Sequence, residues 1–316
     1  MSGGAGDAGR GRLVSAALQQ RASGASGVGW LLVIVTAVGW GFGWPAMKIL
    51  IHDWPALFAR GSAGMLAALG LAVLAAVRGE SLVPPRGLAR RLLLTAAINV
   101  FAWMGFTALS LRWLHVSEAA LLTYTLPIWT TMLAWPVLGE RPAPQSVVAL
   151  CVGMAGMLLL VGGDIASLVH KLPGIAFALS AALLFALGAV TSRRPIAMPP
   201  IALSAWLIGL GSLMMIGIGL ATEHPDPSRL TPAGAGALVY MALGPMALCY
   251  LAWFGALRRV PPGSASAGLL LVPVIGTVSA AFMLGEPLGA RVVTALAVTL
   301  SGVALELHRS TKAARA

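Results

Sequence analysis

Charged residues are scarce in this chain. Asp, Glu, Lys and Arg make up 10% of its 316 residues, whereas soluble domains carry about 25%. Hydrophobic residues make up 58%, the mean hydropathy is +0.88, and the apolar residues gather in long blocks. Such blocks are typical of membrane-spanning segments. The composition therefore excludes a soluble enzyme and a disordered chain.

Cysteine and histidine are also rare. The two cysteines, Cys151 and Cys249, lie inside apolar blocks and predict neither a disulfide framework nor a metal site. The five histidines fall at the ends of apolar blocks or between them, so none is expected at membrane depth. The sequence gives no nucleophile and base at one depth, as a membrane-embedded enzyme would need. We therefore expect no catalytic residues, no metal and no cofactor.

Breaks of charge, proline and glycine divide the apolar blocks into ten candidate helices. About 20 residues of helix cross the hydrocarbon core of a bilayer, and most of the ten approach that length. The sequence therefore predicts an all-α integral membrane protein with ten transmembrane helices. The expected spans are residues 28–50, 55–77, 91–111, 116–137, 144–161, 173–191, 200–221, 234–256, 263–284 and 289–307.

Basic residues are unevenly distributed between these spans. With the N-terminus in the cytoplasm, 15 of the 21 Lys and Arg residues fall in cytoplasmic segments. Because positive charge marks cytoplasmic loops, the net charge of +11 records orientation and does not indicate a nucleic-acid partner. We expect a multi-pass protein of the plasma (inner) membrane with both termini cytoplasmic. Residues 1–27 are expected to be a flexible N-terminal segment and residues 308–316 a basic tail.

Part of the fourth span recurs in the ninth. Pro127 and Glu140 are 13 residues apart, as are Pro273 and Glu286, and the copies are offset by 146 residues. Several such landmarks indicate a duplication. Each copy holds five spans, an odd number, so the copies insert in opposite orientations, and inverted repeats are typical of secondary transporters. Offsets of 145 or 146 also align Trp40 with Phe185, Lys48 with Arg193, Pro55 with Pro200, Arg112 with Arg258, and Gly156 with Gly302.

Several motifs resemble the EamA family of the drug/metabolite transporter superfamily. The resemblance covers nearly the whole chain, as two five-helix repeats at residues 28–161 and 173–307. It implies a ten-helix carrier that moves small metabolites, often outward, by alternating access through a central cavity and without hydrolysing ATP. The motifs are WGFGWPAMK at 40–48, Pro55 with Arg60, SEAALLTYTLP at 117–127, LGERP at 138–142 and LGEP at 284–287.

Three charged residues are not explained by the loop pattern. Lys48 ends the first span, Arg60 lies early in the second and Glu118 begins the fourth, all at the expected outer face. A charge at membrane depth is costly unless it is paired or reaches the interface, so we expect Glu118 to pair with Arg60 or Lys48, or Arg60 to snorkel. Glu118 is the coupling candidate, because the other acids lie in loops or at span ends. The halves differ here, since Ala205 and Ser264 match Arg60 and Glu118.

Two prolines are expected in the middle of helices. Pro127 and Pro273 would each remove a backbone donor and free a carbonyl, which is tolerated where the backbone faces protein or a watery cavity. Their matched placement favours a position in the cavity wall over a simple packing kink. Glu140 and Glu286 follow a glycine at a helix end, and we expect both to be structural, as caps of the next helix.

Four deep aromatic residues complete the expected cavity. Trp40, Trp44, Tyr124 and Trp253 lie on the first, fourth and eighth spans. Rings that face the axis would suit organic substrates with apolar bodies, or cations that sit over a ring face. The other deep aromatics are expected to be packing residues.

The sequence therefore predicts a secondary transporter. We expect an exporter of a small organic metabolite, such as an amino acid or a drug-like compound, with a proton as candidate coupling ion. An uptake permease of the same fold is the alternative, and a non-transporting membrane receptor is a weaker one. A channel would need a continuous polar pore, which these spans do not provide. The substrate, the direction, the coupling ion and the oligomeric state stay open.

Overall fold

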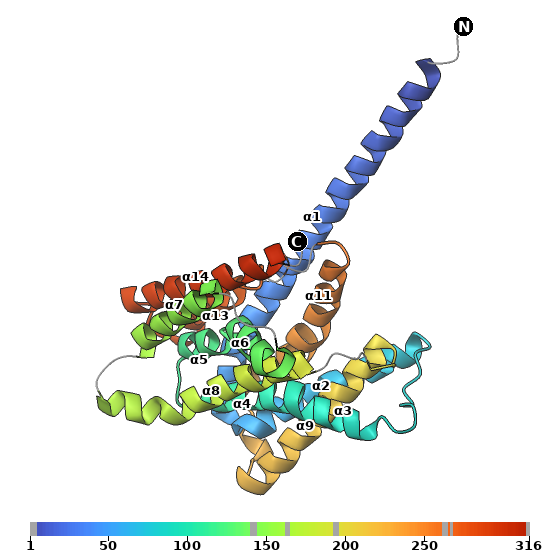
Figure 1. Ribbon diagram of the computed structural model, residues 1–316. Helices are drawn as coiled ribbons and strands as arrows, with labels where there is room; N and C mark the ends of the chain where they lie inside the picture. Colours follow the sequence, from blue (N-terminus) through green and yellow to red (C-terminus); the bar gives the residue numbers. More distant parts are fainter. Residues whose placement is uncertain are drawn as a thin grey trace.

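The computed structural model describes residues 5–139, 144–161, 165–191, 196–260, 265 and 268–313. Every regular element within these ranges is helical (Figure 1). Seven helical segments are long and apolar enough to cross a membrane, and three shorter apolar helices lie within α7, α13 and α14. Each of the ten expected spans therefore corresponds to a helix or to consecutive helices, and the all-α fold is confirmed.

The first five spans contain eight helical elements. α1 takes in most of the expected N-terminal segment, and its first part projects beyond the bundle (Figure 1). The third span is continuous through α3, η1 and α4, whereas the fourth is broken between α5 and α6. The elements are α1 (Ala5–Asp53), α2 (Ala56–Val77), α3 (Ala89–Ala96), η1 (Ala97–Gly105), α4 (Phe106–Ser110), α5 (Val116–Thr123), α6 (Leu126–Leu138) and α7 (Pro144–Val161).

The last five spans repeat this plan. α8 begins at Ile165 instead of at 173 and passes through Pro173. The eighth span is continuous through α10, η3 and α11, like the third. The elements are α8 (Ile165–Thr191), α9 (Pro200–Thr222), η2 (Pro227–Arg229), α10 (Pro232–Leu243), η3 (Gly244–Leu248), α11 (Cys249–Leu257), α13 (Leu271–Leu284) and α14 (Ala290–Ala313).

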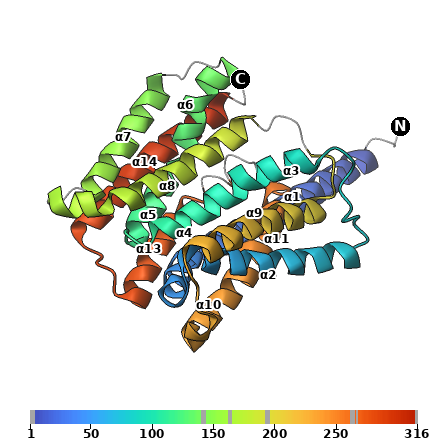
Figure 2. The same ribbon diagram turned by 90° about the horizontal axis from the view of Figure 1, so that it is seen from below.

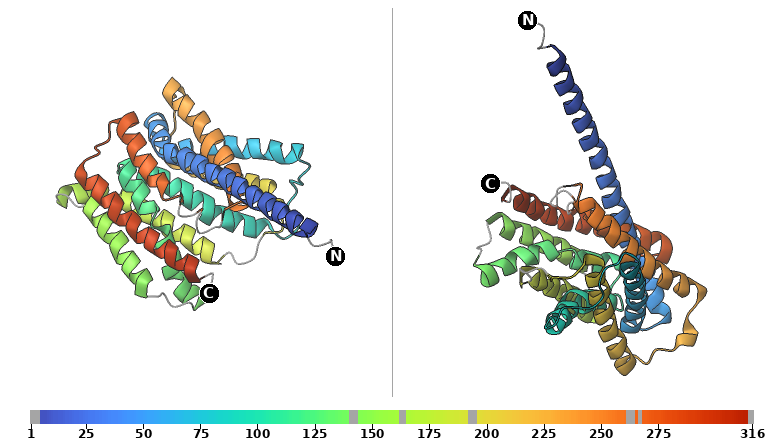
Figure 3. Two further views of the ribbon diagram at one scale, coloured as in Figure 1. Left: turned by 90° about the horizontal axis from the view of Figure 1, so that it is seen from above. Right: turned by 90° about the vertical axis from the view of Figure 1, so that its right-hand side faces the viewer.

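Helix packing is repeated when the two halves are exchanged. α2 packs on α9 and α7 on α14, which pairs the second span with the seventh and the fifth with the tenth. α7 and α14 lie side by side in Figures 2 and 3. α1 packs on α10, α11 and α13, and its counterpart α8 packs on η1, α4, α5 and α6. Each of these contacts therefore has a partner related by a pseudo-two-fold axis.

Two carboxylates show that the repeats are inverted. Glu223, just after α9, accepts a hydrogen bond from the backbone N–H of Phe58 near the start of α2, at 3.0 Å. Glu80, just after α2, accepts one from the N–H of Ala202 near the start of α9, at 2.9 Å. α2 and α9 are therefore antiparallel, although both are the second helix of their repeat. We name the two ends of the bundle the Asp53 face, where α1 ends, and the Glu80 face, where α2 ends.

Candidate substrate cavity

A cavity of about 480 Å³ lies between the two repeats. Its wall comes from the first four spans of the first repeat and from four spans of the second, through α8, the segment α10–η3–α11, the residues before α13, and α14. The volume is within the usual range for small-molecule sites. Because both repeats build the wall, a movement of one repeat against the other would reshape the cavity.

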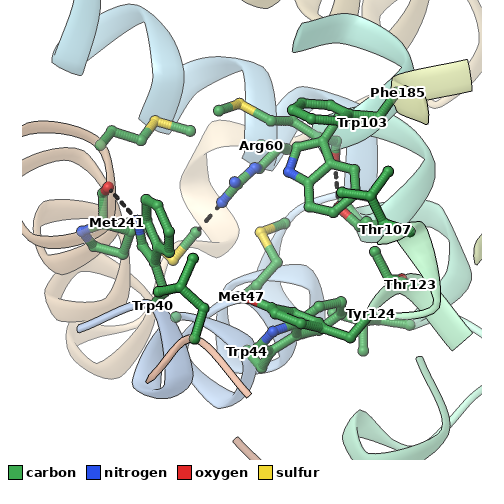
Figure 4. A pocket seen from close by; sticks show the side chains of 18 of the residues that line it. Trp40, Trp44, Met47, Arg60, Trp103, Thr107, Thr123, Tyr124, Phe185 and Met241 are labelled. Carbon is green, nitrogen blue, oxygen red and sulfur yellow. Dashed lines mark hydrogen bonds between the residues drawn. The ribbon is translucent and has the colours of Figure 1, made fainter. Parts of the chain in front are cut away.

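Six of the residues expected in the cavity do line it. Figure 4 shows four of them, with Trp40, Trp44 and Tyr124 around the space and Arg60 reaching across it. Three sequence-predicted aromatic side chains thus share one cavity with a cationic side chain. The six lining residues are Trp40, Trp44, Arg60, Tyr124, Pro127 and Trp253.

The two helix breaks lie against the cavity at equivalent places. The fourth span breaks at Tyr124–Thr125 and the ninth at Leu269–Leu270, 145 residues later, and Tyr124, Leu269 and Leu270 line the cavity. The expectation of a proline in mid-helix is wrong for both prolines. Pro127 and Pro273 lie in the first turns of α6 and α13, where a helix does not need the missing N–H.

Pro273 does not line the cavity. It is buried within the protein, next to the buried Val272 in the first turn of α13. Leu269 and Leu270, which directly precede α13, line the cavity instead. The repeat therefore preserves the backbone break and the proline after it, but of the two prolines Pro127 lines the cavity and Pro273 does not.

Two π-helical segments also occupy equivalent spans. η1 lies in the third span and η3 in the eighth, and such widened turns are frequent at functional sites. Trp103 and Met104 of η1 and Pro245 and Met246 of η3 line the cavity. The Nε1–H of Trp40 donates to the carbonyl oxygen of Pro245 at 2.9 Å, so η3 also holds one aromatic ring in place.

The aromatic residues form two groups related by the repeat. Trp40 lies 5.7 Å from Tyr250 and 6.1 Å from Trp253 between ring centroids, which joins the first span to the eighth. Trp103 and Phe185, 4.7 Å apart, join the third span to the sixth. Exchange of the halves relates these two pairs of spans, so the cavity has an aromatic wall on either side.

Sequence reasoning missed part of this wall. Phe185, Thr107 and Met104 line the cavity although none was expected there. A signal was present for two of them, because the repeat offsets align Phe185 with Trp40 and Thr107 with Trp253. Met104 aligns with Tyr250, which was itself expected to be a packing residue. Alignment with a predicted cavity residue of the other repeat would therefore have identified wall residues that the sequence analysis missed.

Arg60 carries the only formal charge among the described residues that line the cavity. Its Nε is buried without a hydrogen-bond partner within the described part of the chain, and its Nη1 lies 3.9 Å from the sulfur of Met241 (Figure 4). The side chain thus points into the cavity and does not snorkel to the membrane surface. The expected pair of Arg60 with Glu118 is not found within the described residues.

Glu118 lies outside the cavity wall, in a cluster at the Asp53 face. Its Oε1 accepts a hydrogen bond from Lys171 Nζ at 2.5 Å, and its Oε2 accepts one from the backbone N–H of His115 at 3.0 Å. Its partner is therefore Lys171 and not Lys48. Lys171 lies two residues before the expected sixth span, and it belongs to α8 because that helix starts earlier than expected.

Lys48 and Glu286 complete this cluster. Lys48 Nζ donates to the carbonyl oxygens of Leu111, at 2.5 Å, and Leu114, at 2.7 Å, and Leu111 also lines the cavity. Glu286 accepts from the backbone N–H of Val116 at 2.8 Å. Glu286 therefore caps α5, whereas the sequence analysis expected it to cap the helix that follows it. Glu140 lies outside the described residues. We call Lys48, His115, Glu118, Lys171 and Glu286 the Asp53-face cluster.

The contact between His115 and Glu286 favours the charged form of each side chain. The Nδ1 of His115 lies 3.7 Å from Glu286 Oε1. The hydrogen bond to Glu286 raises the pKa of His115, although burial opposes it. Burial alone would raise the pKa of Glu286, but hydrogen bonds from His115 and from the N–H of Val116 outweigh it and lower that pKa. The cluster therefore joins the starts of the fourth and tenth spans by charged contacts.

An all-helical bundle of two inverted repeats around a shared cavity is the architecture of a secondary transporter. Residues 27–162 and 172–307 each match the EamA-like transporter family. The chain belongs to this family and is a multi-pass membrane transporter, not an enzyme.

Known proteins agree with this assignment. The chain is 24% identical over 246 residues to the uncharacterized transporter YoaV of Bacillus subtilis, covering 77% of this chain and 84% of that one. It is 26% identical over 269 residues to a probable amino-acid metabolite efflux pump of Salmonella typhimurium, covering 82% and 88%. A crystal structure at 18% identity matches with a TM-score of 0.62, covering 92% of this chain and 98% of that one, which supports the fold.

Proposed function

We propose that the protein exports a small organic metabolite across the plasma membrane by alternating access. The observation that carries this proposal is the cavity of about 480 Å³ that both inverted repeats enclose. The Salmonella relative is named a probable amino-acid metabolite efflux pump, which favours export over uptake. The excess of basic residues in the loops favours a cytoplasmic position for both termini, and the Asp53 face would then be extracellular.

The pseudo-two-fold arrangement supplies a route for alternating access. Inverted repeats can exchange conformations, so that a closure at one face is replaced by the equivalent closure at the other. The Asp53-face cluster borders the cavity through Lys48 and Leu111 and is the natural closure on the extracellular side. Breaking its contacts would open the cavity to the outside.

A proton is the coupling ion that this arrangement favours. Glu118 is 5% exposed and is held by Lys171, so it would become available to a proton when the cluster separates. In this scheme protonation of Glu118 accompanies the outward opening of the carrier. The substrate contacts would come from Trp40, Trp44, Arg60, Tyr124, Pro127 and Trp253.

Reconstitution in proteoliposomes tests the function. Vesicles loaded with one candidate metabolite should take up the same labelled metabolite by counterflow, with saturation, only when they contain the protein. In cells, deletion of the protein should raise the intracellular level of that metabolite if the protein is an exporter. If it is an uptake permease, the deletion would lower that level. A receptor would bind without counterflow, and a channel would show flux without saturation, so either result would reject the proposal.

A further inference from the structure

We propose that the substrate is an organic monocarboxylate with an apolar or aromatic body, and that Arg60 binds its carboxylate. This proposal rests on the proposed transport function and specifies its substrate class. Three observations carry it: a buried guanidinium with unused donors, a cavity wall without a second charge, and aromatic rings on both sides of the guanidinium.

The first observation is the state of Arg60. Within the described residues its Nε is buried and has no hydrogen-bond partner, and the hydrogen-bond acceptor of its Nη1 is the weakly accepting sulfur of Met241, at 3.9 Å. Buried cations in membrane proteins are normally paired. A guanidinium presents two parallel N–H donors that match a carboxylate. A bound carboxylate would therefore satisfy donors that the described protein leaves unused.

The second observation is the charge of the wall. No Asp, Glu, Lys or His is among the described residues that line the cavity, so Arg60 contributes a single positive charge. One carboxylate neutralises it, whereas a dianion such as a phosphate monoester would bring a buried excess of negative charge. A substrate ammonium group would find no acidic partner in this wall. An amine on the substrate is therefore not needed for binding.

The third observation is the surroundings of the guanidinium. Figure 4 shows Arg60 reaching between Trp40 on one side and Trp103 on the other, with Trp44 and Tyr124 across the cavity. Aromatic rings bind apolar groups and stack on flat ones. The substrate body would lie among these rings while its carboxylate meets Arg60.

The lack of symmetry at this residue fixes the orientation of the substrate. The repeat offset of 145 places Ala205 at the position of Arg60, and Ala205 is buried on α9. The two aromatic groups are duplicated but the cation is not. The substrate would therefore bind with its carboxylate toward α2 in the inward-open and outward-open states alike.

A series of three phenyl compounds tests the proposal. Phenylacetate carries only the carboxylate, phenethylamine only the ammonium and phenylalanine both, and hexanoate replaces the ring with an aliphatic chain. Binding to the purified protein is measured by titration calorimetry, and transport by counterflow in proteoliposomes. We expect phenylacetate to bind at least as tightly as phenylalanine. Phenethylamine should bind at least about tenfold more weakly than phenylacetate, which is the loss expected for a charged hydrogen-bonded pair.

Arg60 variants locate the effect. Arg60→Met should weaken phenylacetate binding by about tenfold or more, and Arg60→Lys should retain part of it, because a lysine keeps the charge but not the paired donors. Arg78→Gln is the matched control on the same helix, since Arg78 lies exposed at the end of α2, and it should bind phenylacetate as the unchanged protein does. Size-exclusion profiles and unfolding temperatures identify any variant that does not fold, and Arg60→Lys then provides the test.

The outcomes separate the two proposals. Three results would overturn the proposed substrate class. They are equal binding of phenethylamine and phenylacetate, unchanged phenylacetate binding in both Arg60 variants, and no binding of phenylacetate or hexanoate. Counterflow of phenethylamine that does not depend on Arg60 would leave transport intact and reject the carboxylate. Arg60-dependent binding of phenylacetate without any counterflow would support the site and reject the transport function.

Discussion

Glu80 and Glu223 form reciprocal helix caps: Glu80, after the end of α2, caps the start of α9, and Glu223, after the end of α9, caps the start of α2. Glu80 follows α2 and accepts from the first N–H groups of α9, and Glu223 follows α9 and accepts from those of α2. A carboxylate at a helix start satisfies unpaired donors and interacts favourably with the helix dipole. The two contacts lie at opposite membrane faces, so together they hold the antiparallel pair in register at both ends.

Removal of either cap should destabilise the protein. We expect Glu80→Ala and Glu223→Ala each to lower the free energy of unfolding by about 1–2 kcal/mol, as for other helix N-caps, and the Gln variants to lower it less because Gln keeps an acceptor. The effects should add in the double variant, because the sites are far apart. Thermal unfolding in detergent measures them.

Asp226→Asn is the control for the caps. Asp226 caps the short helix η2 in an exposed loop. Its replacement should leave the unfolding temperature nearly unchanged. Alanine variants of Glu80 and Glu223 that unfold at the temperature of the unchanged protein would show that these caps do not secure the helix pair.

Gly156 and Gly302 should not tolerate a large side chain. They are equivalent in the two repeats and lie where α7 meets α14. A Cβ at Gly156 would lie 2.9 Å from the carbonyl oxygen of Ala295, and one at Gly302 would lie 2.7 Å from that of Ala149. Because backbone cannot move aside as a side-chain tip can, Gly156→Leu and Gly302→Leu should each cost about 1–3 kcal/mol.

Gly217→Leu is the matched control, because within the described residues no atom outside the local backbone of its own helix lies within 4 Å of the Cβ position at Gly217. The unfolding temperatures of the three variants provide the comparison. Gly→Leu by itself improves helix propensity, so a loss of stability in Gly217→Leu as large as in the other two would mean that the close approach of α7 and α14 does not explain the effect.

The fold could be predicted from the sequence because its two main signals are strong. Apolar blocks of span length and a duplication at 145–146 residues determine the helices and their inversion. The helix ends were harder to predict. The start of α8 at Ile165 was not predicted, because hydropathy does not reveal that a helix continues through Lys171 and Pro173 beyond the apolar block.

The site could be predicted only in part. Deep aromatic residues and Arg60 stand out in the sequence because they are unusual at membrane depth. Which charge meets which cannot be deduced this way, since Glu118 meets Lys171 across a distance of 53 residues in the chain. The prolines misled for a physical reason, because the sequence does not show whether a proline kinks a helix or begins one after a break.

Glu118→Gln tests the proposed proton coupling. If Glu118 takes up a proton during the cycle, the variant should lose most of the pH dependence of counterflow, because its amide does not titrate. Lys171→Met removes the same ion pair but leaves the carboxylate, so it should retain a pH dependence. Counterflow in proteoliposomes at several external pH values provides the measurement. Unchanged rate and pH dependence in Glu118→Gln would reject Glu118 as the coupling residue.

The contact between His115 and Glu286 should make stability depend on pH. The pKa of His115 is raised above 6.5, so its contribution is complete below that pH and is lost as the pH rises through the raised value. The pKa of Glu286 is lowered below 4.5, so its contribution is complete above that pH and is lost as the pH falls through the lowered value. Both are present between pH 4.5 and 6.5.

The difference in unfolding temperature between the unchanged protein and His115→Gln measures this contact. The difference should be largest between pH 4.5 and 6.5 and should shrink on either side. It should be small throughout, because the His115 side chain is 47% exposed and solvent screens the pair. His170→Gln is the control, since His170 is exposed on α8 and its replacement should give a difference without this maximum. A difference for His115→Gln that grows as the pH rises above 6.5 would show that the neutral imidazole, and not the ion pair, stabilises the start of α5.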